Sequence, residues 1–429
     1  MDLFEEFHWR EMLYDATDGA RDALRAAPLT GYIGFDPTAA SLHVGSLLPV
    51  MALARLQRAG HAPIAIVGGG TGLIGDPSGK TQERRLLSVE QVHANLDGIR
   101  RQLERFLDFD RAPNGARIVN NADWLVSIDL MSFLRDVGKY FTVNYMLQKE
   151  SVKRRLDQEE GISYTEFSYL LTQAYDYLVL YDRFGCTLQM GGSDQWGNIT
   201  AGIDLIRKLR GAKAYGIVLP LVTTSSGTKF GKTESGTVWL DASLTSPFRF
   251  YQFWLNTDDR DVVRYLKFFT FLERGEIDDL ARAVSERPDK REAQRALARH
   301  VTDMVHGREQ RDRAEQASAL LFNKGDLRHA SKEDILMVFA DVPSTEVDAA
   351  DFAADGMAVA RLITLSGLEP SASAAARLVK GGCFYVNDER VVGEKDRITL
   401  DRAIDGEILV LRKGPRDRRI IRIRKNRSA

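Results

Sequence analysis

The sequence predicts an α/β fold in which a parallel sheet is followed by a helical region and a small α+β module. Residues 31–35 and 62–67 are short apolar runs, typical of strands covered on both faces of a parallel sheet. From residue 245 to about residue 340 this pattern is replaced by amphipathic stretches rich in Arg and Glu. After residue 357 the pattern returns to a mixture of helix and strand.

Composition and charge limit the class of protein. The chain has 429 residues, of which 44% are hydrophobic and 28% charged, as in soluble globular proteins of several domains. The net charge of −1 means that any contact with nucleic acid is local. The two cysteines, Cys186 and Cys383, lie far apart and indicate a reducing compartment, and the histidines lack metal-ligand spacing. No run is long enough to span a bilayer and residues 1–20 lack a signal peptide's apolar core, so we expect a cytoplasmic protein with no membrane contact.

Four segments follow from these changes of pattern. Residues 1–244 are predicted to form the sheet domain, with an insertion at roughly 120–160 that self-associates through the exposed aromatic pair Tyr140-Phe141. Within it we expect helices at 1–27, from 43 to about 59, 88–108, 165–184 and, entered through residues 191–198, up to 210. We expect strands at 31–35, 62–67, 116–119, 186–190 and 216–220, and a solvated basic cluster at 153–155. The other segments are a helical domain at 245–342, an acidic, irregular linker at 343–356, and a module at 357–429. The basic tail of this last module indicates contact with RNA phosphates.

The stretch 32–47 predicts a strand, a loop and a helix whose first turn carries His43, Gly45 and Ser46. A helix start suits an anion, because its N–H groups are unpaired and its dipole end is positive. Gly45 has no Cβ, which would let a ring or a phosphate approach the backbone. A bound nucleotide is the functional interpretation, and a capped strand–loop–helix with no ligand is the structural one.

The glycine stretch at 68–79 imitates two nucleotide motifs and satisfies neither. A dinucleotide fingerprint must open a helix, whereas residues 76–79 (DPSG) break one, and a P-loop would need glycine where Ile74 stands. Either the loop carries Asp76, Lys80 and Arg84 toward a site or it is a solvated surface loop.

Two further stretches carry polar groups at informative positions. Tyr169, Gln173 and Asp176 are spaced by four and three, which places them on one helix face. That face suits a small zwitterionic ligand with a hydroxyl or amine, or a polar seam between helices or subunits. Asp194, behind two glycines at a strand end, fits a ribose hydroxyl, and Lys229 and Lys232 fit either a phosphate clamp or a solvated basic loop.

Taken together, these stretches resemble the bacterial-type tyrosyl-tRNA synthetases of class I. Residues 43–46 (HVGS) resemble the HIGH signature, with Ser46 in place of its second histidine. Residues 229–233 (KFGKT) resemble the KMSKS loop, with Phe230 and Gly231 in place of Met and Ser. The segments 32–38, 72–79 and 191–195 and the helix face of Tyr169, Gln173 and Asp176 also match, and the end of the chain is similar to an RNA-binding module of a small-subunit ribosomal protein.

The resemblance implies a Rossmann-like fold, activation of L-tyrosine by ATP with Mg²⁺, transfer to tRNA(Tyr), a homodimer, and no tightly bound cofactor. The implied tyrosine-binding residues are Tyr32, Asp76, Tyr169, Gln173, Asp176 and Gln195. The implied ATP-binding residues are Asp36, Thr38, His43, Gly45, Ser46, Gly192, Asp194 and Lys232. The implied catalytic residues are His43, Lys80, Arg84, Lys229, Lys232 and Thr233.

Three other classes of protein were weighed. A nucleotidylyltransferase shares the HIGH turn but does not need the helical region and the basic tail. A tryptophanyl-tRNA synthetase shares the fold, but an indole does not call for the pair Tyr32 and Asp176. An RNA-binding paralogue without activity would lose His43, Asp194 or Lys232, which are all present.

Overall fold

The computed structural model describes residues 2–78, 88–159, 161–225, 227, 230–233, 236–322, 327, 332–339, 342–352, 355–414 and 417–424. The chain forms two compact units, one of residues 1–245 and 253–305 and the other of residues 246–252 and 306–429. Among the described residues, none of the helices has the length and apolar character needed to cross a membrane. In the same ranges, no cluster of three or more His, Cys, Asp or Glu side chains is arranged to hold a metal ion.

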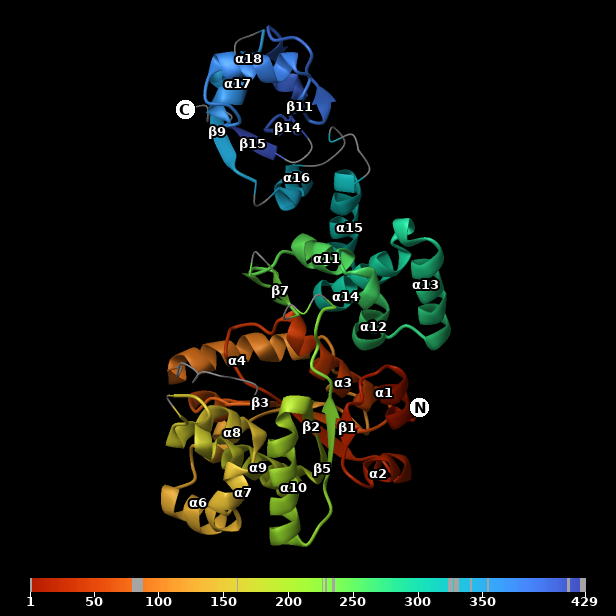
Figure 1. The fold of residues 1–429 in the computed structure, drawn as a ribbon, viewed down its shortest axis with the longest axis vertical. Helices are drawn as coiled ribbons and strands as arrows, with labels where there is room; N and C mark the ends of the chain where they lie inside the picture. Colours follow the sequence, from red (N-terminus) through yellow and green to blue (C-terminus); the bar gives the residue numbers. More distant parts are fainter. Residues whose placement is uncertain are drawn as a thin grey trace. The chain divides into compact units, whose positions relative to one another are not determined.

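A six-stranded sheet organises the larger unit, in the order β1-β6-β5-β2-β3-β4 (Figure 1). Its parallel strands are β2 (Thr30–Phe35), β3 (Ala62–Val67), β4 (Arg117–Asn120), β5 (Cys186–Gly192) and β6 (Tyr215–Leu219), and β1 (Asp15–Ala16) runs antiparallel to β6. The parallel sheet predicted from the apolar runs is therefore confirmed. Tyr32 on β2 is paired in register with Ile64 on β3 and with Gln189 on β5, so residues of three distant segments are neighbours at the middle of the sheet.

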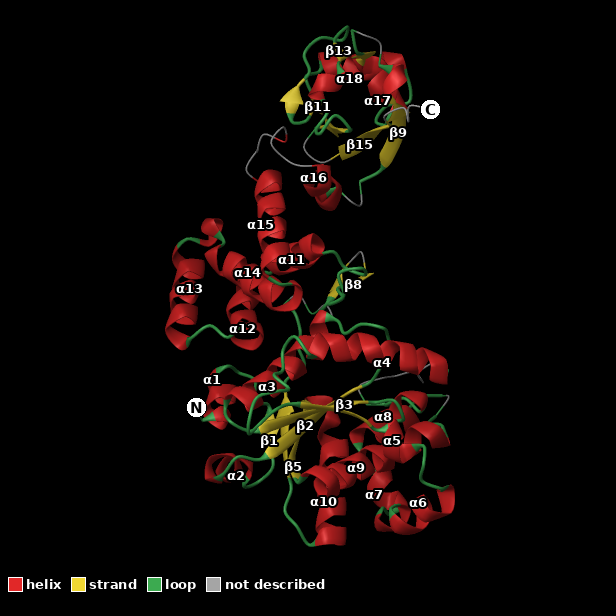
Figure 2. Cartoon of the chain, turned by 180° about the vertical axis from the view of Figure 1, so that it is seen from behind, coloured by secondary structure: helices red, strands yellow, loops and turns green. Residues whose placement is uncertain are grey.

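Helices cover the sheet on both faces (Figure 2). The principal ones are α3 (Leu47–Arg58), α4 (Val89–Leu103), α9 (Tyr164–Phe184) and α10 (Trp196–Arg210). Ser88 and Gln91 form a capping box that begins α4, and Ser163 caps α9, which ends at Gly185 with a φ of 62°. These helices lie where the periodicity predicted them.

The N-terminal prediction of one helix over residues 1–27 is wrong. The structure has α1 (Leu3–Trp9), the short strand β1, and α2 (Ala20–Ala26). Glu11 has a φ of 59° and Gly19 a φ of 83°, and both values interrupt a right-handed helix. The Thr17 backbone N–H donates to the Gly216 carbonyl instead, which adds this segment to the edge of the sheet.

Two expectations for the insertion are also corrected. Phe141 is buried and Tyr140 packs against the core around Tyr177, so this pair is not an exposed patch. Arg155, expected in a solvated basic cluster, is buried beside Glu166, with Nη2 at 2.9 Å from Oε2. The insertion folds into α5 (Ala122–Leu125), α6 (Leu130–Asp136), η3 (Gly138–Tyr140), α7 (Val143–Leu147) and α8 (Glu150–Leu156).

The helices predicted after residue 245 are divided between the units. They are α11 (Pro247–Leu255), α12 (Asp259–Phe269), α13 (Arg274–Glu286), α14 (Glu292–His306), α15 (Arg308–Phe322) and α16 (Lys332–Val338). Residues 253–305 belong to the same compact unit as the six-stranded sheet, whereas residues 306–339 belong to the same unit as the C-terminal module.

The C-terminal module is built on a five-stranded sheet in the order β12-β11-β14-β15-β9. Its strands are β9 (Ser344–Asp348), β11 (Phe384–Val386), β12 (Glu389–Arg390), β14 (Ile408–Lys413) and β15 (Asp417–Arg424); β10 (Met357–Ala358) pairs separately with β13 (Arg397–Ile398). The predicted helices are present as α17 (Val359–Leu365) and α18 (Ala372–Lys380). The segment expected to be an irregular linker contains β9, which pairs in parallel with β15, so that expectation is corrected.

Candidate active site

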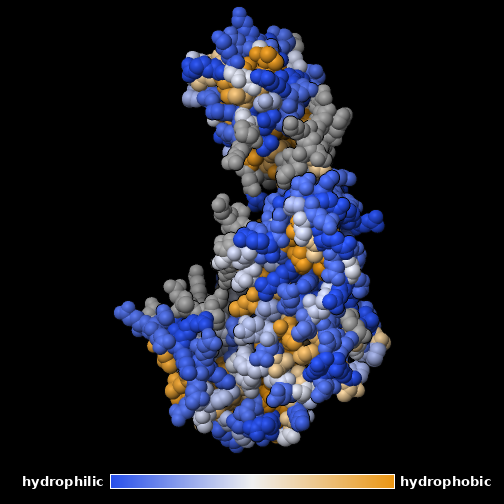
Figure 3. Space-filling view, turned by 45° about the vertical axis from the view of Figure 1, so that its right-hand side comes forward, coloured by the Kyte–Doolittle hydropathy of each residue, from blue (hydrophilic) through white to orange (hydrophobic). Residues whose placement is uncertain are grey.

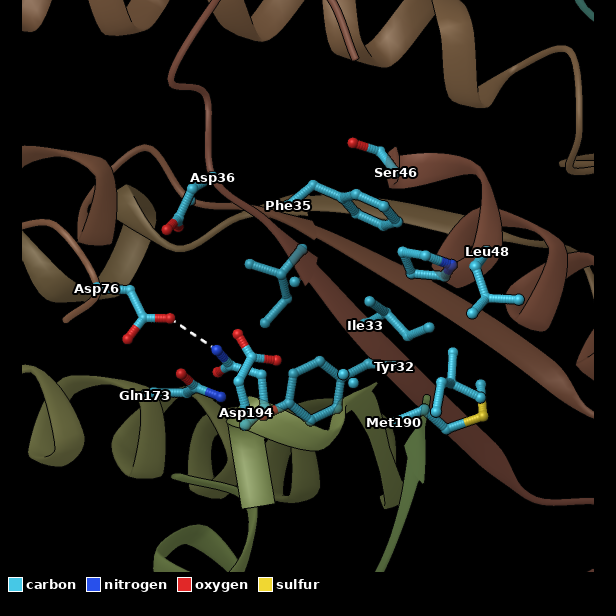
Figure 4. A pocket seen from close by; sticks show the side chains of 18 of the residues that line it. Tyr32, Ile33, Phe35, Asp36, Ser46, Leu48, Asp76, Gln173, Met190 and Asp194 are labelled. Carbon is cyan, nitrogen blue, oxygen red and sulfur yellow. Dashed lines mark hydrogen bonds between the residues drawn. The ribbon is translucent and has the colours of Figure 1, made fainter. Parts of the chain in front are cut away.

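A cavity of about 360 Å³ lies where the carboxyl ends of β2 and β5 meet the first turn of α3. In open α/β sheets this is the usual place for a ligand. Most residues singled out in the sequence line it, namely Tyr32, Asp36, Thr38, His43, Gly45, Ser46, Asp76, Tyr169, Gln173, Asp176, Gly192, Asp194 and Gln195. Figure 4 shows Asp76, Gln173 and Asp194 directed toward one space, although they come from three separate segments.

The turn that begins α3 is shaped by His43 and Gly45. The Gly45 backbone N–H donates to His43 Nδ1 at 3.0 Å, which folds the imidazole over the turn. A Cβ on Gly45 would lie only 2.6 Å from His43 Cε1, so any larger residue would displace the imidazole. His43, Gly45 and Ser46 of this turn all line the cavity.

Asp176 provides a buried carboxylate at the α9 side of the cavity. It accepts hydrogen bonds from Trp124 Nε1 at 2.7 Å and Asn121 Nδ2 at 2.9 Å. Burial raises its pKa to about 7, and the two hydrogen bonds oppose that rise. The carboxyl group therefore changes charge near neutral pH.

Two buried polar atoms of the cavity lining have no hydrogen-bond partner among the described residues. They are the Tyr32 hydroxyl and Gln189 Oε1. Burial, and then the Asp176 charge, raise the pKa of Tyr32 well above its ordinary value, so its hydroxyl keeps its proton. An unpaired buried polar group costs about 1–3 kcal/mol, which a ligand carrying its own polar group would recover.

A connected set of amides and one carboxylate lies beside this region. Gln195 Nε2 donates to Asp76 Oδ2 at 2.7 Å, the contact drawn as a dashed line in Figure 4. Asn198 Nδ2 lies 3.0 Å from Gln173 Oε1 and 3.1 Å from Gln195 Oε1. The set fixes the side-chain oxygens of Gln173 and Asp76 around a space that suits an ammonium group.

For the other predicted site residues, the structure describes only the backbone or nothing at all. Lys80, Arg84 and Lys229 lie outside the described residues. The backbone of Lys232 and Thr233 forms β7, which pairs with β8 (Gly236–Thr237). The preceding residue, Gly231, lies against the first turn of α3, because a Cβ there would be 2.7 Å from Val44 Cγ2.

Two family models match this chain. The family model for class I tRNA synthetases (W and Y) matches residues 24–323, and the model for the tyrosine–tRNA ligase SYY-like C-terminal domain matches residues 334–420. A tyrosine–tRNA ligase of Roseiflexus castenholzii is 54% identical over 98% of this chain and 99% of the relative. A tyrosine–tRNA ligase of Bacillus caldotenax is 51% identical over 98% of this chain and its own full length.

This chain belongs to the tyrosine–tRNA ligase family. A truncated mitochondrial tyrosyl-tRNA synthetase of Aspergillus nidulans superposes with a TM-score of 0.68 at 32% identity, over 75% of this chain and 94% of the other. A tryptophanyl-tRNA synthetase of Encephalitozoon cuniculi, at 14% identity and a TM-score of 0.53, shares the fold. The enzyme class and the fold class predicted from the sequence are thus confirmed.

Sequence reasoning missed four residues of this ligase's cavity region: Asn121, Trp124, Gln189 and Asn198. Asn121 and Trp124 hold Asp176, and Asn198 joins Gln173 to Gln195. Gln189 could have been identified from the sequence, because a glutamine inside an apolar strand is buried and burying it without a hydrogen-bond partner is unfavourable. Asn121 and Trp124 could not have been identified in this way, because only the fold brings their segment to α9.

The Asp176 carboxyl predicts a pH dependence that distinguishes tyrosine from phenylalanine. A phenol donates to the ionised carboxylate, so tyrosine affinity should be lost as pH falls through the pKa of about 7. The loss should approach ~10-fold per pH unit below that value. Phenylalanine has no hydroxyl and should show no such loss when both are measured by equilibrium dialysis. Parallel profiles for the two amino acids would contradict this placement of the phenol.

The same pKa shift acts on stability in the opposite direction. Because the folded ligand-free protein favours the neutral carboxyl, it binds more protons than the unfolded chain between the ordinary value of 3.8 and about 7. This group's contribution to the free energy of unfolding should therefore decrease as pH rises across that interval. Asp176→Asn should remove that contribution together with the pH dependence of tyrosine affinity.

Proposed function

We propose that this ligase activates L-tyrosine with ATP and transfers the tyrosyl group to tRNA(Tyr), using the cavity between β2, β5 and α3. The observation that carries the proposal is the buried Tyr32 hydroxyl, which has no partner in the part of the chain that the structure describes and lines the same cavity as Asp176. A phenol can donate to the Asp176 carboxylate and accept from the Tyr32 hydroxyl, which satisfies both groups. Neither an aliphatic side chain nor a phenyl ring can do so.

The polar side chains of the cavity indicate where the α-ammonium group and the carboxylate of the amino acid bind. The α-ammonium group binds Asp76, Tyr169 and Gln173, and Gln195 holds Asp76 in place at 2.7 Å. The carboxylate then extends toward the first turn of α3, where ATP binds with Mg²⁺ as part of the substrate. The nucleotide contacts are assigned to Asp36, Thr38, His43, Gly45, Ser46, Gly192 and Asp194, which all line the cavity.

The chemistry requires positioning and charge stabilisation, with no nucleophile from the enzyme. The tyrosine carboxylate oxygen attacks the α-phosphorus of ATP, the bond to the bridging oxygen breaks, and pyrophosphate leaves with the electron pair. His43 donates a hydrogen bond to an oxygen of the α-phosphate as charge develops, while Lys80, Arg84, Lys229, Lys232 and Thr233 bind the pyrophosphate oxygens. A ribose hydroxyl of tRNA then attacks the tyrosyl carbonyl carbon, and AMP leaves.

ATP–pyrophosphate exchange tests the proposal directly. Each proteinogenic amino acid is supplied separately with ATP and labelled pyrophosphate. Exchange should depend on tyrosine and remain near background with phenylalanine and tryptophan. Exchange stimulated equally by tryptophan would show that the pocket does not select a phenol.

The proposed ligase is a cytoplasmic homodimer, and the structure suggests a surface for the second copy. Large apolar side chains are exposed on the insertion and at the start of α9: Val126, Leu130, Met131, Leu134, Val143, Leu147, Leu156 and Tyr164. The space-filling view shows hydrophobic residues interrupting an otherwise hydrophilic surface on the larger unit (Figure 3). An apolar patch of this kind is typical of an interface, and this set replaces the Tyr140-Phe141 pair expected from the sequence.

We expect Met131→Glu to prevent dimerisation. The Met131 side chain is 72% exposed, so the substitution leaves the fold of one chain intact but places a charge in the apolar interface. Light scattering at micromolar concentration should give twice the mass of one chain for the natural protein and a single-chain mass for the variant. Val392→Glu is the matched control, because Val392 is 76% exposed but lies in the C-terminal module. A dimer that survives Met131→Glu but not Val392→Glu would contradict the assignment.

A further inference from the structure

Helix α12 presents a stripe of three side chains to the segment that leads into β7. Asp261, Tyr265 and Phe269 are spaced by four, so they lie on one face of the helix. All three are buried although two of them carry polar groups. Their partners lie on both sides of Lys229 in the sequence.

The polar part of the stripe holds the backbone before Lys229. The two oxygens of the Asp261 carboxylate accept from the Ser225 backbone N–H at 3.1 and 3.0 Å, and Oδ2 also accepts from the Ser225 hydroxyl at 3.0 Å. The Tyr265 hydroxyl donates to the Thr223 carbonyl at 3.1 Å. Such hydrogen bonds to a buried carboxylate are directional and among the stronger ones in proteins.

The aromatic part of the stripe holds the residue after Lys229. Phe230 is buried, and its ring stacks on Phe269 with an interplanar angle of 6° and a centroid distance of 5.5 Å. The Tyr265 ring meets Phe230 edge-on at 5.0 Å. Phe253 and Trp254 of α11 complete this aromatic cluster at 5.7 and 5.9 Å. Tyr265 therefore contacts both sides of Lys229, through its hydroxyl and through its ring.

The segment is also attached to the first turn of α3. The Val238 backbone N–H donates to the Gly231 carbonyl at 3.0 Å, and the Val44 N–H donates to the Val238 carbonyl at 3.0 Å. Gly231 has a φ of 79°, a conformation that favours glycine, and lies against Val44. The backbone between Phe230 and Lys232 is thus bound to the turn that carries His43.

The far end of α12 is bound to the same helix α3. The Arg55 guanidinium, on the last turn of α3, donates to the carbonyls of Lys267, Phe268 and Thr270 at 2.6–3.2 Å. Arg10 adds bonds to the carbonyls of Thr270 at 3.3 Å and Leu272 at 2.8 Å. These carbonyls at a helix C-terminus carry negative partial charge, so two buried cations stabilise them. Helix α12 is therefore fixed to α3 at its C-terminal end, where Phe269 also stacks on Phe230, while Asp261 near its N-terminal end holds Ser225.

We propose that Asp261, Tyr265 and Phe269 are positioning residues for tyrosine activation, because they hold Ser225 and Phe230, which stand on either side of Lys229 in the sequence, and Phe230 leads directly into the Gly231 backbone that is attached to the His43 turn. The inference rests on the proposed function, in which the lysines of this segment bind pyrophosphate. Charge stabilisation of a transition state needs donors that are already in place, and a displacement of about 1 Å can cost ~10²-fold in rate. The stripe supplies that order while touching no substrate.

The test compares two neighbouring phenylalanines of α12. Phe268 and Phe269 are equally buried and their rings meet edge-on at 5.9 Å, but of the two it is Phe269 that stacks on Phe230, whereas the Phe268 ring lies under the Arg264 guanidinium at 5.0 Å. Phe269→Leu should slow the single-turnover formation of tyrosyl-adenylate by about 10- to 100-fold and leave tyrosine affinity within about twofold. Each substitution removes a buried phenyl ring, so both should lower the melting temperature by similar amounts. Phe268→Leu, however, should leave the rate of adenylate formation unchanged.

Tyr265→Phe keeps the ring and removes only the bond to Thr223, so it serves if Phe269→Leu does not fold. It should slow adenylate formation with unchanged tyrosine affinity. An unchanged rate in Tyr265→Phe, or equal slowing in Phe268→Leu and Phe269→Leu, would overturn the inference. Tyrosine-dependent exchange by the natural protein tests the proposed function separately, and Lys232→Ala tests the lysine's assigned role. Failure of the α12 variants alone therefore refutes only the positioning role.

Discussion

Replacing Tyr32 by phenylalanine should make the protein more stable and the enzyme less selective. Without ligand, the Tyr32 hydroxyl is buried with no partner among the described residues, so its removal relieves a cost of about 1–3 kcal/mol in the free energy of unfolding. With tyrosine bound, the same hydroxyl is expected to pair with the substrate phenol. Its removal then leaves one side of the phenol unsatisfied.

The effect on specificity follows from the same cost of leaving a buried hydroxyl without a hydrogen bond. The kcat/KM for tyrosine should fall and that for phenylalanine should rise, which narrows their ratio by about 10- to 100-fold. The measurements are kcat/KM for both amino acids by pyrophosphate exchange, and the melting temperature without ligand. Tyr177→Phe helps to interpret the result, because its hydroxyl is paired with the Tyr215 carbonyl at 2.8 Å. That substitution should destabilise the protein, whereas Tyr32→Phe should stabilise it.

An unchanged selectivity ratio in Tyr32→Phe would show that Tyr32 does not face the phenol. A fall in melting temperature would show that the hydroxyl has a partner in the ligand-free protein. Either result would move the amino-acid pocket elsewhere in the cavity.

Removal of the C-terminal module should almost abolish tRNA charging and spare tyrosine activation. The module belongs to a separate compact unit from the sheet that carries the cavity, and the basic residues Arg422 and Arg424 of β15 are exposed. Contacts of such residues with phosphates release counterions and contribute strongly to RNA affinity. We expect charging at physiological salt to fall by ~10²–10³-fold and pyrophosphate exchange to change by no more than about twofold.

The structure shows where this truncation must be made. A cut near residue 350, suggested by the sequence, would separate β9 from β15. It would also expose the second face of the module's sheet, where Leu327, Ile335 and Phe339 pack on residues of β14 and β15. The chain should instead end at Phe322, the last residue of α15, because α15 belongs to the same unit as residues 246–252 and accepts a hydrogen bond from Gln252 at Ser318. Normal charging by this shortened protein would exclude the module as the main RNA contact.

A point substitution provides a milder version of the same experiment. Arg422→Ala removes one exposed cation from β15, next to the ion pairs that Arg424 makes with Glu346 and Asp348. If Arg422 contacts a phosphate, the salt dependence of tRNA affinity should lose about one unit of slope. Tyrosine activation should not change.

Local sequence pattern was sufficient for much of the fold. The apolar runs became β2 and β3 because a strand buried on both faces must be apolar along its length. The spacing of Tyr169, Gln173 and Asp176 placed them on one face of α9, and all three line the cavity. Prediction failed where a turn or a distant partner overrode the local pattern, as at Gly19, Phe141 and Arg155.

The sequence by itself determined the family, the order of the elements and most residues of the candidate site, because these depend on periodicity and on motifs within a few residues. Only the tertiary structure decided how those residues are held. Trp124 reaches Asp176 across 52 residues and Gln195 reaches Asp76 across 119, distances over which a pattern carries no signal. It also decided which polar atoms of the described residues are buried without a partner, and that α12 holds both Ser225 and Phe230. Burial and pairing are properties of the packed chain, so a pocket that recognises a hydroxyl can be identified only after the chain is folded.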